Sequence, residues 1–147
     1  MINYKIREAK PSDFPAILQL IKELAFYEKA PEKVTNTVAQ MKQDQACFKA
    51  IVAEKEDGEI IGFALFYFVY YTWVGKSLYL DDLYVKETYR SNKIGSKLLN
   101  RVISYGKKNN CKRIRWQVLH WNQPAIDFYK KLGVNLDNEW LNCDLEF

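Results

Sequence analysis

The chain has 147 residues, a formal net charge of +4 and three cysteines. This length suits a single domain, residues 1–147, that buries most of the surface its unfolded chain exposes. The cysteines are widely spaced and form no C-x-x-C pair, which favours reduced thiols in a cytoplasmic protein. No cluster of lysine and arginine is interleaved with aromatic residues, so a nucleic-acid-binding surface is not expected.

The apolar segments predict neither export nor membrane insertion. Residues 1–10 alternate apolar and polar side chains and lack the apolar core of a signal peptide. The longest apolar run, residues 60–71, is shorter than the roughly 20 residues that a membrane-spanning helix needs. Its β-branched and aromatic side chains predict a buried strand instead.

Apolar periodicity, caps and turn residues divide the chain into strands and helices. In chain order they are a strand at 4–7, a helix from Ser12 to near Glu28, a short helix at 37–44, strands at 48–54, 59–71 and 77–85, a helix from Ile94 to Asn109, a strand at 113–119, a helix from Asn122 to Gly133 and a strand at 140–147. The dipeptide Asp57-Gly58 predicts a β-hairpin, and Gly75 predicts a second tight connection.

The order of these elements predicts an α+β fold. Successive antiparallel strands come first, and a strand, helix and strand then form a right-handed crossover from residue 77 to residue 119. That crossover makes one strand pair parallel in an otherwise antiparallel sheet. We expect a mixed sheet of six or seven strands with helices on both faces.

The stretch from Tyr79 to Leu99 carries the strongest functional signal. A strand there runs through a loop of small and basic residues into the start of a helix. Unpaired backbone N–H groups at the positive end of a helix dipole form a site for phosphate. Two carboxylates, Asp81 and Asp82, lie near the end of the same strand, so binding and chemistry are expected to share it.

Two motifs carry a resemblance to a known superfamily. Arg90-Ser-Asn-Lys-Ile-Gly95-Ser96 and Trp121-Asn-Gln-Pro-Ala-Ile-Asp-Phe-Tyr129-Lys-Lys-Leu-Gly133 resemble the acetyl-CoA site of the GNAT N-acetyltransferases. The superfamily loop is usually written Q/R-x-x-G-x-G/A, so Lys93 stands where its first glycine is expected. Within the superfamily, the chain is most similar to the diamine acetyltransferases, the spermidine/spermine N1-acetyltransferase-like group. That similarity includes residues 20–28, 62–67, 73–82 and 121–133.

The resemblance implies acetyl-CoA as cosubstrate, no metal, and a homodimer formed through the C-terminal region. The parallel strand pair would form the cofactor cleft. The implied cofactor-binding residues are Leu83, Tyr84 and Val85 for the pantetheine arm, Arg90, Ser91, Asn92, Lys93, Ile94, Gly95 and Ser96 for the phosphates, and Asn122, Gln123, Pro124 and Ala125 at the thioester end. The implied amine-site residues are Tyr27, Glu28, Asp81, Asp82, Arg115, Trp116 and Gln117, and Tyr129 matches the proton donor.

Elementary chemistry supports these roles. An amine of pKa ~10.4 is mostly ammonium at neutral pH, so a carboxylate must take a proton before the amine can attack, and Asp81 is the candidate. The leaving thiolate has a pKa near ~8.5, and a tyrosine hydroxyl within reach, that of Tyr129, can protonate it. If the strand end at residues 82–85 splays from its neighbour, pantetheine amides can pair with its backbone, and one N–H can hold the thioester oxyanion.

Other interpretations stay open. Paired aspartates at a strand end are often solvated charges, Tyr129 beside Phe128 is compatible with an ordinary core aromatic, and Glu28 with a helix-surface charge. His120 has no ligand partner at metal-binding spacing, so no metal is expected. The main hypothesis is acetylation of a small polyamine, diamine or lysine-like (thialysine) substrate. The alternatives are a protein lysine or N-terminal acetyltransferase and a non-catalytic module that senses acetyl-CoA.

Overall fold

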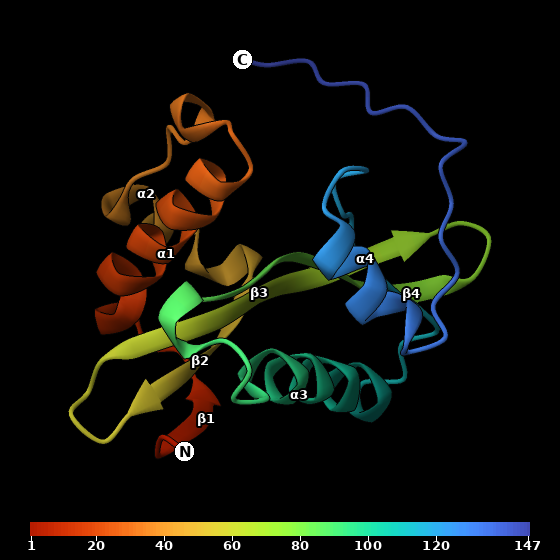
Figure 1. The fold of residues 1–147 in the computed structure, drawn as a ribbon. Helices are drawn as coiled ribbons and strands as arrows, with labels where there is room; N and C mark the ends of the chain where they lie inside the picture. Colours follow the sequence, from red (N-terminus) through yellow and green to blue (C-terminus); the bar gives the residue numbers. More distant parts are fainter. The chain divides into compact units, whose positions relative to one another are not determined.

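Five strands form one mixed sheet in chain order (Figure 1). They are β1 (Tyr4–Glu8), β2 (Lys49–Lys55), β3 (Ile60–Tyr71), β4 (Gly75–Val85) and β5 (Ile114–Arg115). The computed structural model describes all residues, 1–147, which divide into two parts, Met1–Gln117 and Val118–Phe147. The sheet belongs to the first part. That all 147 residues form one domain stays a prediction.

The pairing of the strands confirms the predicted mixture of directions. The first four strands are antiparallel neighbours, and β5 lies parallel to β4. The hairpin between β2 and β3 turns at Gly58, whose φ of 88° is accessible to glycine at little cost. The parallel ladder is very short, because only Leu78 and Tyr79 of β4 have partners on β5.

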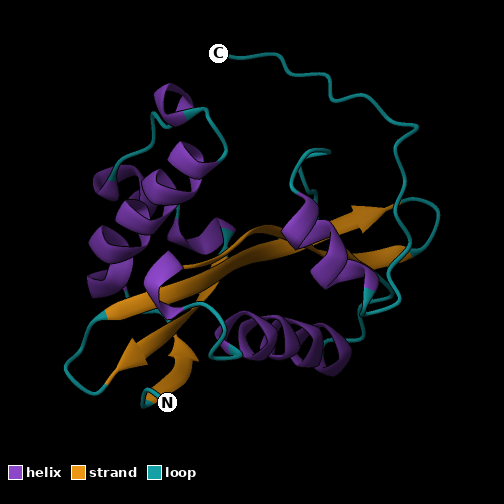
Figure 2. Ribbon diagram, viewed as in Figure 1, coloured by secondary structure: helices purple, strands orange, loops and turns teal.

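Two helices cover opposite faces of this sheet (Figure 2). Of the four α-helices, α1 (Phe14–Tyr27), α2 (Val38–Gln43) and α3 (Ile94–Lys108) belong to the first part, and α4 (Gln123–Lys130) belongs to the second. The alternation of side chains along a strand sends Phe63 toward α1, whereas its neighbour Gly62 lies against Ile94 and Leu98 of α3. No helix combines the length and the apolar composition that crossing a membrane requires.

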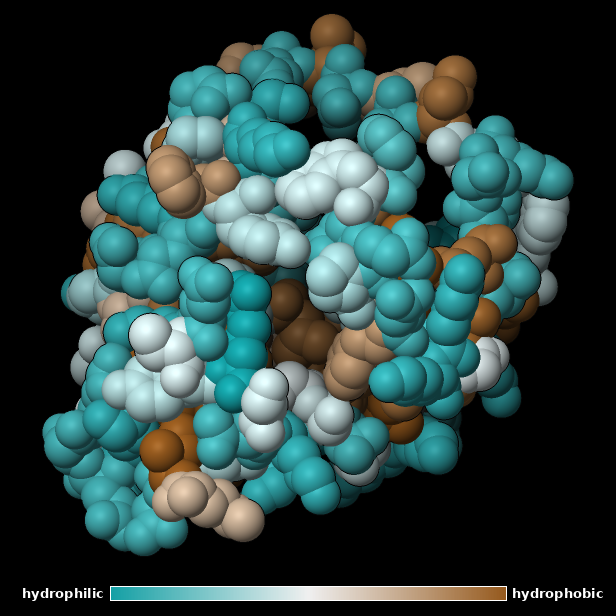
Figure 3. Space-filling view, in the orientation of Figure 1, coloured by the Kyte–Doolittle hydropathy of each residue, from teal (hydrophilic) through white to brown (hydrophobic).

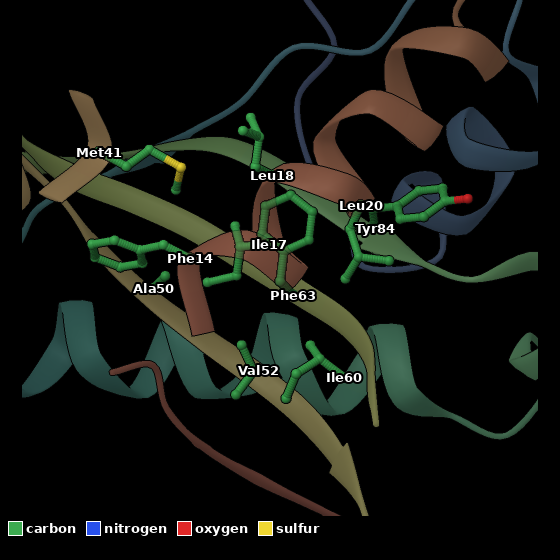
Figure 4. Packing of buried hydrophobic residues seen from close by; sticks show 10 residues of the cluster. All are labelled: Phe14, Ile17, Leu18, Leu20, Met41, Ala50, Val52, Ile60, Phe63 and Tyr84. Atoms are coloured by element: carbon green, nitrogen blue, oxygen red, sulfur yellow. The ribbon is translucent and has the colours of Figure 1, made fainter. Parts of the chain in front are cut away.

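The core between α1 and the sheet contains the apolar positions that the helical periodicity predicts (Figure 4). Ile17 and Phe63 in it are fully buried. Its members come from α1, α2 and strands β2 to β4: Phe14, Ile17, Leu18, Leu20, Met41, Ala50, Val52, Ile60, Phe63 and Tyr84. Burying such side chains stabilises a fold by about 1.5–3 kcal/mol each, so this layer holds α1 on the strands.

One of the two predicted helix caps is confirmed, because Asn122 accepts from the N–H of Ala125 at the start of α4. At the start of α2, Thr37 accepts from the N–H of Gln40, a cap that the sequence analysis did not name. The prediction that Ser12 caps the first helix is wrong. Asp13 precedes α1, and its carboxylate accepts from Arg7 and from the N–H of Lys10 instead of capping the helix.

The prediction of six or seven strands is wrong, because the structure has five. Residues 113–119 contribute only the two-residue strand β5, and residues 140–147 form no strand. A strand is defined by the neighbour with which it exchanges hydrogen bonds, so an apolar alternation without such a neighbour does not make one.

The loop before α3 contains two residues in the left-handed region. Ser91 has a φ of 69° and Lys93, which precedes the first helical residue, has a φ of 61°. This conformation costs an L-residue roughly 1–2 kcal/mol, whereas glycine adopts it freely. The backbone therefore explains why a glycine is expected where this chain has Lys93.

Lys93→Gly should stabilise the folded protein. Release of the left-handed strain exceeds the extra entropy of glycine in the unfolded chain, for a net gain of about 0.5–1 kcal/mol in the free energy of unfolding. The matched control is Lys97→Gly, inside the helix, which should cost about 1 kcal/mol. Urea unfolding of the three proteins measures both effects, and equal losses in the two variants would contradict the left-handed geometry of Lys93.

Candidate functional site

A β-bulge in β4 places two carboxylates on one face of the sheet. Asp82 lies opposite Leu65 of β3 and Leu80 lies opposite Phe66, so Asp81 is an extra residue without a partner in the register. Consecutive residues of a regular strand point to opposite faces, and a bulge interrupts that alternation. Asp81 and Asp82 therefore both lie on the face covered by α1, which the sequence alternation alone does not predict.

Asp81 is exposed and is held by a tyrosine of the neighbouring strand. The hydroxyl of Tyr67 donates to Oδ1 of Asp81 at 3.1 Å. The Tyr67 ring stacks on Tyr79, with the ring centroids 5.7 Å apart. Burial and the charge of Asp81 raise the pKa of Tyr67, so this phenol stays protonated and remains a donor. Tyr67 is a site residue that the sequence motifs did not identify.

Asp82 is the carboxyl group whose titration lies nearest to neutral pH. Burial raises its pKa to about 7, with further contributions from the charges of Asp81 and Glu28. Glu28, which follows the last residue of α1, also has a raised pKa because it is partly buried. The structure thus brings Glu28, Asp81 and Asp82 together as an acidic cluster, and their role in an amine site stays a prediction.

Arg90 connects the loop before α3 to α1 and β4. Its Nε donates to the carbonyl oxygen of Val85 at 3.1 Å. Its guanidinium carbon lies 5.4 Å from the ring centroid of Tyr27 and 5.6 Å from that of Tyr84. Cation–π contacts of this kind stabilise by about 0.5–1 kcal/mol at exposed sites. Tyr27, predicted for the amine site, and Arg90, predicted for the phosphates of acetyl-CoA, therefore lie side by side.

One edge of β4 has no strand partner in the first part of the chain after Tyr79. The N–H of Lys86 donates to Ile61 of β3, so the alternation turns the backbone of Tyr84 toward β3 and the backbones of Leu83 and Val85 toward the open edge. The side chain of Tyr84 is also engaged, because it is buried and its hydroxyl donates to Glu23 at 3.3 Å. Leu83 and the N–H of Val85 can therefore pair with an extended ligand, whereas the carbonyl of Val85 already accepts from Arg90 and Tyr84 faces the other way.

The start of α3 presents backbone donors as predicted. Its first helical hydrogen bond runs from the N–H of Lys97 to the carbonyl of Lys93 at 3.0 Å. The preceding N–H groups, of Ile94, Gly95 and Ser96, have no carbonyl one turn earlier and lie at the positive end of the dipole. A Cβ on Gly95 would meet only Val85, at an ordinary 3.8 Å, so packing does not require glycine there.

Two side-chain contacts hold this loop in shape. The amide of Asn92 donates to the carbonyl of Tyr89 at 3.0 Å and to that of Arg90 at 3.3 Å. The hydroxyl of Tyr4 in β1 donates to the carbonyl of Asn92 at 3.0 Å. The side chain of Asn92 therefore shapes the loop, and Tyr4, which the sequence analysis did not identify, connects the loop to β1.

Arg115, which the resemblance assigns to the amine site, lies in β5. Its guanidinium lies 4.8 Å from the ring centroid of Tyr71, and Arg113 lies 5.3 Å from the same ring. Trp116 and Gln117 follow the strand end. No group of three His, Cys, Asp or Glu side chains is arranged to hold a metal ion.

The second part of the chain carries the other predicted site residues. Gln123 and Pro124 open α4, and the amide of Gln123 donates to Asp127 at 2.7 Å. Tyr129 lies in the same helix, with its ring centroid 5.4 Å from that of Phe128. At the start of this helix, the N–H of Ala125 donates to Oδ1 of Asn122 at 3.4 Å.

The residues of the first part suit acetyl-CoA chemically. An open strand edge can pair with the amides of pantetheine, and the free N–H groups at the start of α3 can hold a pyrophosphate. The acidic cluster lies at the bulge on the same strand, where a cationic amine would be attracted. One strand therefore offers an anion site at its end and a cation site at its middle.

Comparisons with known proteins show the family to which the chain belongs. The acetyltransferase (GNAT) family model matches residues 14–134. The chain is 40% identical over 145 residues to the thialysine N-epsilon-acetyltransferase of Sus scrofa, covering 91% of this chain and 85% of that protein. It is 35% identical to the protein of the same name from Mus musculus, covering 99% and 94%.

Solved structures support the same fold. A possible acetyltransferase from Clostridium difficile 630 has a TM-score of 0.80 at 21% identity, and the match covers 100% of both chains. An aminoglycoside acetyltransferase from a soil metagenomic sample has a TM-score of 0.79 at 19% identity, covering 98% and 96%. At these identities the likeness concerns the fold alone. Together with the family model and the sequence relatives, it identifies the chain, which belongs to the GNAT family of acetyltransferases.

Proposed function

We propose that the chain transfers the acetyl group of acetyl-CoA to a primary amine of a small polyamine, diamine or lysine-like substrate such as thialysine. The observation that carries this proposal is the bulge in β4, which sets Asp81 and Asp82 on one face beside an open strand edge. The names of relatives at 35–40% identity, the thialysine N-epsilon-acetyltransferases, support the same substrate class. A small dicationic or amino-acid amine matches a cluster of three carboxyl groups.

Backbone groups of the first part would hold the donor. Bound acetyl-CoA supplies an acetyl group activated as a thioester. Leu83 and Val85 offer strand-like pairing to its pantetheine arm, with Tyr84 between them as a packing residue. The N–H groups of residues 94–96 and the loop residues Arg90 to Lys93 would hold the phosphates. By resemblance, Asn122, Gln123, Pro124 and Ala125 belong at the thioester end.

The acidic cluster would bind the amine as ammonium and then accept its proton. Asp81, fixed by Tyr67, is exposed and suited to attract the cation. Asp82, with a pKa of about 7, is ionised above neutral pH and becomes protonated just below it, which suits a proton acceptor. Glu28 adds a third carboxyl group, and Tyr27, Arg115, Trp116 and Gln117 would complete the walls of the amine site.

Thiol release from acetyl-CoA across an amine panel tests the function. Spermidine, thialysine, lysine, and a peptide with a free N-terminus and a lysine side chain cover the candidate classes, and a reaction without amine is the control. We expect release with a small amine and none with the peptide. Release with the peptide alone would identify a protein acetyltransferase, and thermal stabilisation by acetyl-CoA without any release would identify a sensing module.

The pH dependence of kcat/KM should report Asp82. Below pH 7 the carboxyl is protonated and cannot accept a proton, so kcat/KM should rise about tenfold per pH unit and level off above pH 7. Asp82→Asn should remove this plateau, because the amine must then lose its proton to solvent and kcat/KM rises toward the amine pKa of ~10.4.

The Asp81→Asn variant distinguishes the role of Asp81 from that of Asp82. It removes a charge that raises the pKa of Asp82, so the plateau should begin at lower pH and amine binding should weaken. Glu56→Gln, an exposed position on the β2–β3 hairpin, is the control and should keep the original profile. A wild-type profile in Asp82→Asn, with an upward shift in Asp81→Asn, would assign the proton to Asp81 instead.

Tyr129→Phe should lower kcat by roughly 10²–10⁴-fold while acetyl-CoA affinity stays nearly unchanged, because only the proton for the leaving thiolate is lost. The matched control is Phe128→Tyr, whose position neighbours Tyr129 in α4. Single-turnover kinetics and calorimetric titration measure the two quantities. A wild-type kcat where chemistry limits turnover would show that the phenol only packs.

The chain should form a homodimer. Large apolar side chains of residues 136–147 are exposed, and this segment forms no strand in the single chain. Pairing with a second copy would bury them. Sedimentation at micromolar concentration should give twice the 17.4 kDa chain mass, and Leu141→Asp should shift it to the monomer. A monomer alone in the wild type would contradict this.

A further inference from the structure

The tip of the β3–β4 hairpin exposes aromatic side chains on the face of the sheet that α3 covers. Phe68 packs against Tyr105 of α3, with the ring centroids 5.9 Å apart, and the alternation along β3 places Tyr70 on the same face. Phe68, Tyr70 and Trp73 are 43%, 77% and 83% exposed. In Figure 1 the hairpin extends past the end of α3. A Cβ on Gly75, in the turn, would meet nothing within 4 Å, so the tip projects into open space.

Basic side chains border these rings. Nζ of Lys76, in β4, lies 4.6 Å from the ring centroid of Phe68. Arg101 and Lys108 are two turns apart in α3 and flank Tyr105 on the same side of the helix. All three cations are exposed and belong to none of the ion pairs of this protein. Figure 3 shows mostly hydrophilic side chains over α3, which runs along the lower part of this view.

The segments that build this surface contain no acidic residue. Residues 60–80 have no aspartate or glutamate, and residues 97–117 have seven lysines and arginines and again no aspartate or glutamate. Because residues 97–117 alone carry a charge of +7, and the whole chain one of +4, the remainder of the chain is net negative. The positive charge is thus concentrated on α3 and the segment after it, where it attracts an extended polyanion more strongly than a single small anion.

We propose that this hairpin surface docks on an anionic lipid membrane. Its members are three exposed aromatic residues and three unpaired cations: Phe68, Tyr70, Trp73, Lys76, Arg101 and Lys108. Tryptophan and tyrosine rings are favoured at the level of the lipid headgroups, and each lysine or arginine close to anionic headgroups strengthens the binding. Docking of this kind needs no membrane-spanning segment and does not depend on acetyl transfer.

The shape of the hairpin surface favours a membrane over a single-stranded nucleic acid. A nucleic-acid strand is held in a basic groove, where its bases stack on aromatic rings. Here the rings of Tyr70 and Trp73 lie on a projecting tip, beside cations that spread along α3. A projecting tip can enter the headgroup region while the cations stay at its anionic surface.

Co-sedimentation with lipid vesicles tests the cations of the hairpin surface. Vesicles of phosphatidylcholine and phosphatidylserine in equal amounts should bind the wild type about 100-fold more tightly than phosphatidylcholine alone, at about fivefold for each of three cations. Lys76→Gln combined with Lys108→Gln should weaken this binding about 25-fold. The matched control combines Lys22→Gln and Lys42→Gln, exposed lysines of α1 and α2, and should keep the wild-type affinity.

Tryptophan fluorescence tests the aromatic tip. Vesicles of the same headgroups with brominated acyl chains should quench the wild-type fluorescence, and Trp73→Ser should lose most of this quenching and bind about tenfold more weakly. The matched control is Phe26→Ser, because Phe26 of α1 is also an exposed aromatic residue, at 75%. It should bind and be quenched as the wild type is.

Each outcome decides for or against the membrane. Equal binding to the two kinds of vesicle, no binding to either at low salt, or wild-type binding in the Lys76 and Lys108 double variant would overturn the inference. Tighter binding of a single-stranded oligonucleotide than of the anionic vesicles, weakened in the same double variant, would also overturn it and assign the surface to nucleic acid. The expected vesicle results would support it whether or not thiol release from acetyl-CoA is observed.

Discussion

The separation of β4 from its parallel neighbour is the constraint on which the candidate site depends. β5 pairs with β4 only at Leu78 and Tyr79, so the backbone of Leu83 and Val85 keeps hydrogen-bonding groups at an open edge. An extended ligand can satisfy these groups as an added strand would. The bulge at Asp81 lies between the paired and the unpaired segments and turns two acids to the same face. A single irregular strand thus contributes to both of the proposed substrate sites.

Local patterns predicted most of the fold. The 3.6-residue repeat of α1 and α3, the Asp57-Gly58 turn and the polar cap at Asn122 act over a few residues, and each appears in the structure. The strand at residues 140–147 and most of that at 113–119 do not, because a strand needs a partner that alternation cannot supply. Ser12 is not a cap because it lies within the 3-10 turn Pro11–Asp13, and Asp13, which precedes α1, is engaged by Arg7 of β1, a contact that no local pattern contains.

In the candidate site, too, sequence motifs identified some residues, whereas others depend on contacts between distant segments. The sequence motifs indicated Asp81, Asp82 and residues 90–96, since a family resemblance records residue types at fixed spacing. They did not indicate Tyr67, Tyr4 or the shared face of the two acids, because these depend on the register between β3 and β4 and on the approach of β1 to the loop. The roles of Tyr129 and residues 122–125 stay predictions that rest on the resemblance.

Opposite charges lie at the bulge of β4 and in the loop that follows β4. Burial, with further contributions from the charges of Asp81 and Glu28, raises the pKa of Asp82, whereas the loop retains Lys93 in a backbone conformation that disfavours lysine. In the proposed function, a cationic amine would reduce the repulsion among the carboxylates, and an anionic nucleotide would be attracted to the positive charge beside the start of α3. Because these charges nearly cancel within the chain, a modest net charge of +4 is compatible with two strongly charged and opposite sites.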